Sequence, residues 1–148
     1  MKARLTTVLA LMSALFFNSM FVEADPATPK IINGQPVSIS SVPWQVAIVF
    51  ADTSDDYAAQ FCGGSIVSAD WVVTAAHCFP GLTASDIEIV TGVSTLGAAG
   101  SSRIGVQEII SHPDYDDWTL EHDIALLKVS SAIPLNGSTR ASIELPFE

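Results

Sequence analysis

The sequence predicts an all-β protein, and three observations support that prediction. Proline and glycine are frequent, with 8 and 9 residues among 148, while charged residues make up only 15% of the chain. This composition suits short strands joined by turns better than a helical bundle. Several short stretches are rich in β-branched and aromatic residues, or alternate between two faces, as half-buried strands do. The length lies within the usual size of one domain.

The first 24 residues have the pattern of a secretory signal peptide. Lys2 and Arg4 give a positive start, residues 5–22 are mostly apolar, and the segment ends on the small residue Ala24. A transmembrane anchor is the alternative, but the segment is barely long enough to span a bilayer and Asn18 interrupts it. We therefore expect residues 1–24 to be removed. The protein would then be secreted (extracellular or periplasmic), with no membrane attachment.

The first strand is expected within residues 42–50, after a proline-rich segment at 25–30. The alternation suits a strand with one face on a core. One face would carry Trp44, Val46, Ile48 and Phe50, and the other Gln45, Ala47 and Val49. Residues 51–60 hold Asp52, Asp55 and Asp56, and we expect them to form a solvated hairpin loop rather than a metal site.

A β-hairpin is expected next, with strands at 65–67 and 71–74 and a tight turn at 68–70. The chain's only two cysteines, Cys62 and Cys78, flank this hairpin. Export favours their oxidation, and closing that loop would add roughly 3 kcal/mol to stability. His77 lies directly beside the second cysteine, so a disulfide would hold its imidazole in place, as a general base requires.

Three further strands are expected at 87–93, 103–110 and 124–129, separated by glycine-rich or proline-containing loops. Asp123 precedes the last of them, and a carboxylate at the mouth of an apolar strand is costly unless another group pairs with it. Residues 130–148 have the composition of a linker. Within them Asn136-Gly137-Ser138 matches an N-glycosylation sequon, which matters only in a glycosylating secretory pathway.

Two segments carry a family resemblance. Cys-Gly-Gly-Ser-Ile at 62–66 and Val-Thr-Ala-Ala-His-Cys at 73–78 resemble the catalytic-histidine segment of trypsin-like (chymotrypsin-fold) serine proteases. Asp-Ile-Ala-Leu-Leu at 123–127 resembles their catalytic-aspartate segment. The resemblance implies a six-stranded antiparallel Greek-key barrel, the first of the family's two barrels. It also implies that His77 is the general base and Asp123 the acid that orients it. The alternatives are an ordinary strand-end histidine and a capping or turn aspartate.

Lys30-Ile31-Ile32-Asn33-Gly34 resembles the family's activation site, where cleavage after a basic residue frees an apolar N-terminus. The resemblance implies a propeptide at 25–30, an activating protease that cleaves between Lys30 and Ile31, and a peptidase region at 31–148. A plain linker before the first strand is the alternative.

The family's nucleophile lies in a Gly-Asp-Ser-Gly-Gly motif on the second barrel, and this sequence does not contain that motif. We therefore expect residues 31–148 to be the N-terminal part of a domain truncated before the nucleophile. The resemblance implies a secreted serine-type endopeptidase, made as a zymogen, that acts on proteins or peptides through an acyl-enzyme. This chain alone is expected to be inactive without the missing C-terminal barrel. The competing hypothesis is a non-catalytic secreted binding module.

Charge excludes other classes of partner. Residues 31–148 carry 3 basic and 14 acidic residues. Nucleic acids and anionic membrane surfaces reward positive charge, so neither is an expected partner. A metal protein using His77, His112, His122 and the acidic residues is the last-ranked alternative, because no spacing resembles a ligand set. We expect no metal and no other cofactor.

Overall fold

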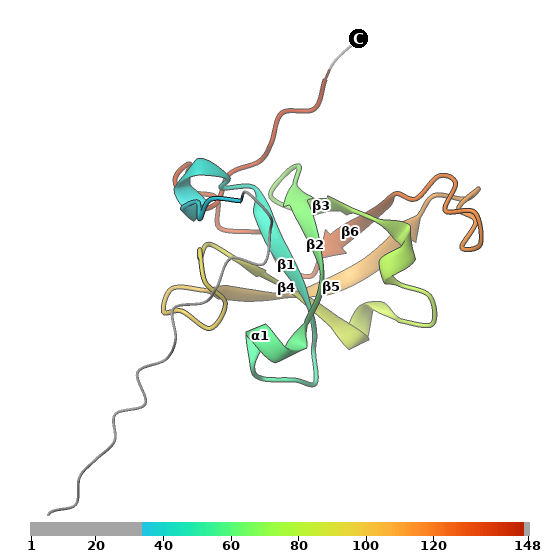
Figure 1. Cartoon of the computed structure of the whole chain (residues 1–148), viewed down its shortest axis with the longest axis horizontal. Coiled ribbons are helices and arrows are strands. Elements are labelled where there is room, and N and C mark those ends of the chain that lie inside the picture. The colour runs from blue at the N-terminus through green and yellow to red at the C-terminus, as the bar shows by residue number, and fades with distance from the viewer. Residues whose placement is uncertain (1–33, 147–148) are drawn as a thin grey trace, which may run out of the picture. The chain divides into compact units, whose positions relative to one another are not determined.

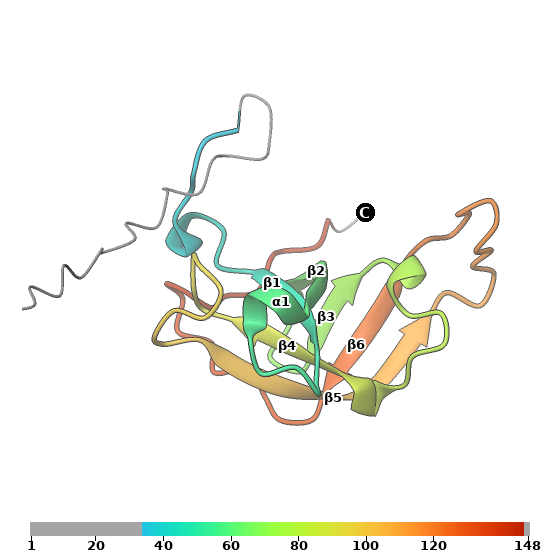
Figure 2. The same cartoon turned by 60° about the horizontal axis from the view of Figure 1, so that its bottom comes forward.

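The computed structural model describes residues 34–146, which form a closed barrel of six antiparallel strands. The strands are β1 (Gln45–Phe50), β2 (Gln60–Ile66), β3 (Trp71–Thr74), β4 (Ile87–Thr91), β5 (Ser102–Ser111) and β6 (Ala125–Val129). Their order around the barrel is β1-β2-β3-β6-β5-β4, and β4 closes onto β1 (Figures 1 and 2). The neighbours β4-β1-β2-β3 have the Greek-key order. The predicted all-β, six-stranded antiparallel barrel is confirmed.

Within residues 34–146, helical structure is limited to single turns. The α-helix α1 spans Asp56–Ala59, and three 3₁₀ turns lie at Ile39–Ser41 (η1), Ala76–Cys78 (η2) and Ala84–Asp86 (η3). Among the described residues, none of these helices has the length and apolar character needed to cross a bilayer. The predicted signal peptide, propeptide and activation site at Lys30–Ile31 lie outside the described residues.

The barrel interior is filled by branched aliphatic side chains from every strand. Its largest fully buried members include Ile48, Ile66, Ile89 and Leu127. Because successive side chains of a strand point to opposite faces, alternate residues of each strand reach this interior. β-Branched residues suit these positions because their stiff side chains pack well on a pleated surface.

The prediction that β1 has one buried face is wrong. All four residues from Val46 to Val49 are buried, so both faces of the strand are covered. Ala47 and Val49 pack on the outer side in a second cluster with Ala59 of α1 and Val90 of β4. The outer side of β1 is covered by α1 and by the loop after β4. These contacts form only in the folded chain.

The loop between β1 and β2 is not the simple solvated hairpin that the sequence predicts. Asp55 caps α1 by accepting hydrogen bonds from the backbone N–H groups of Tyr57 and Ala58, and β2 begins earlier than expected, at Gln60. Asp56 is buried and forms an ion pair with Arg103 of β5, with 3.2 Å between its Oδ1 and the guanidinium Nη1.

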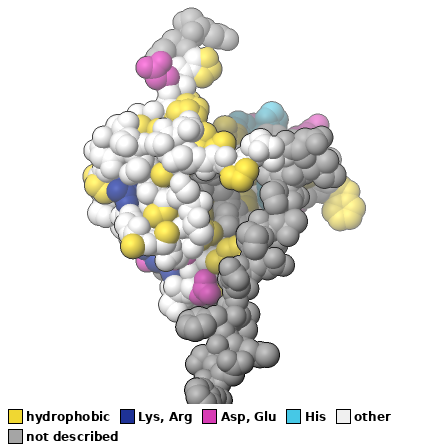
Figure 3. All heavy atoms as spheres, turned by 60° about the vertical axis from the view of Figure 1, so that its left-hand side comes forward, with side chains coloured by type: hydrophobic (Ala, Val, Ile, Leu, Met, Phe, Trp, Pro, Cys, Tyr) yellow, Lys and Arg dark blue, Asp and Glu magenta, His cyan; other side chains and the backbone are white. Residues whose placement is uncertain are grey.

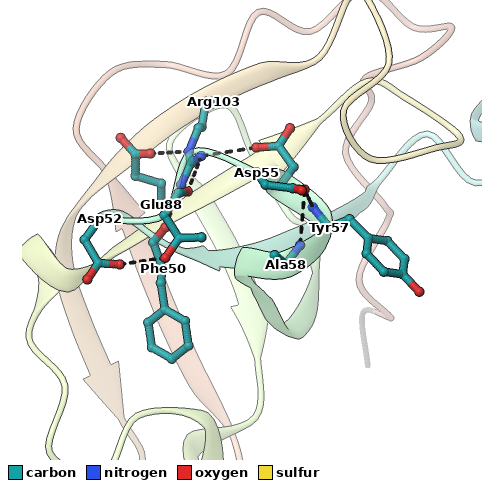
Figure 4. Close-up of polar contacts among 9 residues, drawn as sticks. Phe50, Asp52, Asp55, Tyr57, Ala58, Glu88 and Arg103 are labelled. Carbon is teal, nitrogen blue, oxygen red and sulfur yellow. Dashed lines mark hydrogen bonds and ion pairs between the residues drawn. The ribbon is translucent and has the colours of Figure 1, made fainter.

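Arg103 anchors this loop to the barrel (Figure 4). Its guanidinium also donates to the Glu88 carboxylate, to the Thr53 carbonyl at 2.9 Å and to the Phe50 carbonyl at 2.6 Å. Two carboxylates and two carbonyls therefore satisfy one partly buried cation, which offsets the cost of withdrawing its charge from water.

Candidate functional site

His77 occupies the 3₁₀ turn η2, directly after β3. Two neighbours fix this turn, because Ala76 is buried in the core and Cys78 forms a disulfide with Cys62 of β2. The structure thus contains the expected disulfide across the start of β2 and the end of the hairpin. The His77 side chain itself stays accessible, with 52% of its surface exposed.

Asp123 lies beside His77 although the two residues are far apart in the sequence. β3 and β6 pair antiparallel, with Thr74 opposite Ala125, so the segment that follows β3 meets the segment that precedes β6. The Asp123 Oδ2 lies 2.7 Å from His77 Nδ1, across a sequence separation of 46. The structure therefore brings together the two residues that the resemblance pairs.

The Asp123 carboxylate holds His77 at two points. Its second oxygen, Oδ1, accepts a hydrogen bond from the backbone N–H of His77 at 2.8 Å. The hydrogen bonds from the imidazole and then from this N–H lower the pKa of the Asp123 carboxyl from its ordinary value. An ionised carboxylate can only accept, so Nδ1 carries a proton, and in the neutral ring Nε2 has the free lone pair. That tautomer is the one a general base needs.

A shallow pocket lies beside this pair and has acidic surroundings. Its lining includes Ala76, Phe79, Tyr115 and Asp117. Desolvation, and then the negative charges of nearby aspartates, Asp123 first among them, raise the pKa of the Tyr115 hydroxyl. Cationic groups of a bound molecule would be favoured in this field.

The loop that delivers Asp123 is held by its own polar contacts. Asp116 accepts hydrogen bonds from the backbone N–H groups of Trp118 and Thr119, at 2.8 and 3.0 Å. Leu120 and His122 have positive φ, at 59° and 55°. Such conformations are unusual for residues other than glycine and persist where the surroundings impose them.

Sequence reasoning missed two features of this site. The His122 ring stacks on that of His112, with 4.7 Å between their centroids, a contact that the sequence did not predict. The backbone N–H of His77 also donates a hydrogen bond to Asp123. The sequence pattern could not predict this bond, because every residue other than proline carries a backbone N–H. The His112–His122 stack is equally invisible in sequence, because it depends on how the ends of the loop meet.

The described residues contain one cluster of three potential metal-ligating residues, formed by Cys62, His77 and Cys78, with donor atoms within 4.8 Å of one another. Both sulfurs belong to the disulfide, so neither is available as a thiolate, the form that binds metals.

Comparisons with known proteins give a consistent result. A family model described as Trypsin matches residues 31–146. A trypsin from Simulium vittatum is 40% identical over 147 residues, which cover 95% of this chain and 57% of that protein. An anionic trypsin from Canis lupus familiaris is 36% identical over 133 residues, covering 85% of this chain and 49% of that protein.

A solved structure supports the same likeness. The crystal structure of a scabies mite inactivated protease paralogue, S-D1, matches with a TM-score of 0.68 and 33% identity, covering 78% of this chain and 46% of that one. The chain thus spans about half the length of each of these three proteins.

Proposed function

The chain belongs to the trypsin family of serine proteases, and from this premise we propose that the protein is a secreted serine endopeptidase. His77 acts as general base, taking the proton from a serine hydroxyl as that oxygen attacks the peptide carbonyl. It then returns the proton to the leaving amine as the acyl-enzyme forms. Asp123 orients the imidazole and stabilises its protonated form. The observation that carries this proposal is the 2.7 Å contact between His77 Nδ1 and Asp123 Oδ2.

The nucleophilic serine belongs, in this proposal, to the part of the relatives' length that this chain does not span. An apolar face of the barrel supports a second barrel as partner. Ile110 and Leu126 are 40% and 38% exposed there, with Ile124 and Leu145 more so. They line an open pocket of about 370 Å³ whose surface is almost wholly apolar. Large exposed apolar patches mark interaction surfaces.

Activation is proposed to follow the family's route. An activating protease cleaves between Lys30 and Ile31 after a signal peptide at 1–24 has been removed, and the propeptide at 25–30 is released. The Lys30-Ile31-Ile32 sequence supports this proposal. We expect proteins or peptides as substrates, and membership of the trypsin family supports this expectation.

The decisive experiment is a peptidase assay on the complete gene product after cleavage at Lys30. We expect hydrolysis of a fluorogenic peptide that His77→Ala abolishes, and labelling of a serine by a fluorophosphonate probe. Residues 31–148 alone should hydrolyse nothing. Turnover by that chain alone, lost on His77→Ala, would refute the assignment of the nucleophile to a missing segment.

A non-catalytic binding module is the second candidate, and the likeness to an inactivated protease paralogue favours it. The paired His77 and Asp123 argue against it, because a binding module has no need of an imidazole held in one tautomer. A complete gene product that binds proteins but is not labelled by the fluorophosphonate probe would support the module.

A further inference from the structure

The turn that follows β6 is built around one asparagine. The Asn136 side-chain oxygen Oδ1 accepts hydrogen bonds from the backbone N–H groups of Ser138, Thr139 and Arg140, at 3.0, 2.9 and 3.0 Å. The Arg140 carbonyl in turn accepts from the backbone N–H groups of Asn136 and Gly137. These five bonds hold residues 136–140 as a closed turn, with the amide of Asn136 in a defined place.

This turn is open to solvent at its first three residues. Asn136, Gly137 and Ser138 are all exposed. A Cβ atom added to Gly137 would meet no other atom within 4 Å, so there is free space beside the turn. These three residues are also the only sequon of the form Asn-X-Ser/Thr in the sequence.

We propose that Asn136 is an N-glycosylation site of this protein. The co-reactant is a lipid-pyrophosphate-linked oligosaccharide of the secretory pathway. The Asn136 Nδ2 attacks the anomeric carbon, the N–C bond forms, and the bond from that carbon to the pyrophosphate oxygen breaks. One Nδ2 proton is lost, and the lipid pyrophosphate leaves. Surface loops of secreted proteins are where such sequons are used.

The hydrogen bonds of the turn are compatible with the modified side chain. Glycosylation leaves Oδ1 unchanged, so its three backbone donors keep their acceptor. It also leaves one proton on Nδ2, and the structure uses only one there, in a bond to Thr139 Oγ1 at 3.0 Å. The modified amide therefore keeps as many Nδ2 protons as the turn uses.

The site lies away from the proposed catalytic pair. Arg140 ties the turn to the end of β4 and to the loop that follows it, donating to Thr91 Oγ1 at 3.0 Å and to the Gly100 carbonyl at 2.7 Å. In Figures 1 and 2 that loop lies at the opposite end of the barrel from the orange loop at 112–124 that carries Asp123. Among the atoms that are not grey, few charged side chains are visible on the face of the molecule drawn in Figure 3.

The test uses the full chain with an established secretory leader in place of residues 1–24, expressed in insect cells. This replacement separates the site from the proposal that residues 1–24 are a signal peptide. After digestion with trypsin, the peptide Val129–Arg140 is analysed by mass spectrometry with and without peptide-N-glycosidase F. We expect this peptide to carry a hexosamine-containing glycan, and the enzyme to convert Asn136 to aspartate.

Two variants of one residue provide the controls. Ser138→Ala destroys the sequon but keeps every hydrogen bond of the turn, because Ser138 takes part through its backbone N–H. It should reduce the glycosylated fraction to background, whereas Ser138→Thr should retain it. Unmodified peptide in wild-type chain recovered from medium or from the secretory compartments overturns the proposal. A glycan that survives Ser138→Ala overturns it as well.

Discussion

At the scale of single residues, one carboxylate determines the geometry of the site. Asp123 binds the imidazole of His77 through one oxygen and its backbone N–H through the other. The ring is thereby fixed in orientation and in tautomer, while more than half of its surface stays accessible to a substrate. A general base works only when both conditions hold.

Asp123→Asn in the complete protein tests this orientation. An amide that offers its N–H₂ to Nδ1 favours the tautomer with the proton on Nε2, which cannot act as a base. We expect kcat to fall by about 10⁴-fold, with a small change in KM. Steady-state kinetics on a fluorogenic peptide measure this. Asp70→Asn, in the exposed turn between β2 and β3, is the control, and an equal loss there would contradict the argument.

The pH dependence of stability tests the same contact without any activity. The folded-state pKa of Asp123 is lowered by its bonds to His77, so its contribution to stability is complete above the unfolded value, about 3.9. That contribution is lost as the pH falls through the folded-state pKa. The difference in free energy of unfolding between wild type and Asp123→Asn should therefore shrink below about pH 4. Urea titrations at several pH values measure it, and a difference that grows toward acid would be inconsistent with the contact.

At the scale of elements, β5 holds the loop between β1 and β2 through Arg103. Its partners come from β4, from the end of β1 and from α1, so a single side chain connects three elements. The sequence offered a signal, since Arg103 is one of only 6 basic residues. The sequence did not identify the partners of Arg103, because Glu88 and Asp56 are 15 and 47 residues away from it.

Arg103→Met should release this loop. The substitution leaves Glu88 and the buried Asp56 without their cation, and we expect a loss of about 2–3 kcal/mol in the free energy of unfolding. Hydrogen exchange of residues 51–59 should rise while that of β3 and β6 is unchanged. Glu108→Gln, exposed on the same strand, should cost less than about 0.5 kcal/mol. A similar loss in the free energy of unfolding for both variants would show that the contacts of Arg103 do not hold the loop.

At the scale of the whole molecule, the barrel closes every strand edge but leaves one apolar face open. The face around Ile110, Ile124, Leu126 and Leu145 has no cover in the described residues. Its apolar area is what a second domain would bury.

Residues 31–148 alone should therefore self-associate. We expect the weight-average mass in sedimentation equilibrium to rise with concentration, and the double variant Ile124→Ser, Leu126→Ser to reduce that rise. The two residues are 47% and 38% exposed, so the double variant should cost less stability than substitutions in the buried core. If the double variant associates as strongly as the wild type, the apolar face is not the surface through which the chains associate.

The sequence by itself determined the strand content, the disulfide partners and the two residues proposed for catalysis. Strand periodicity is local, two cysteines allow one pairing, and the segments around His77 and Asp123 resemble a family. The predicted strand at 71–74 is β3 itself, whereas β2 begins five residues before the run at 65–67.

Only the tertiary structure decided which surfaces meet. The pairing of β3 with β6 joins His77 to Asp123, α1 covers the outer face of β1, and Arg103 neutralises a buried aspartate. Each of these contacts links segments far apart in sequence. Their geometry depends on strand register and on closure of the barrel, which no local pattern of residues encodes.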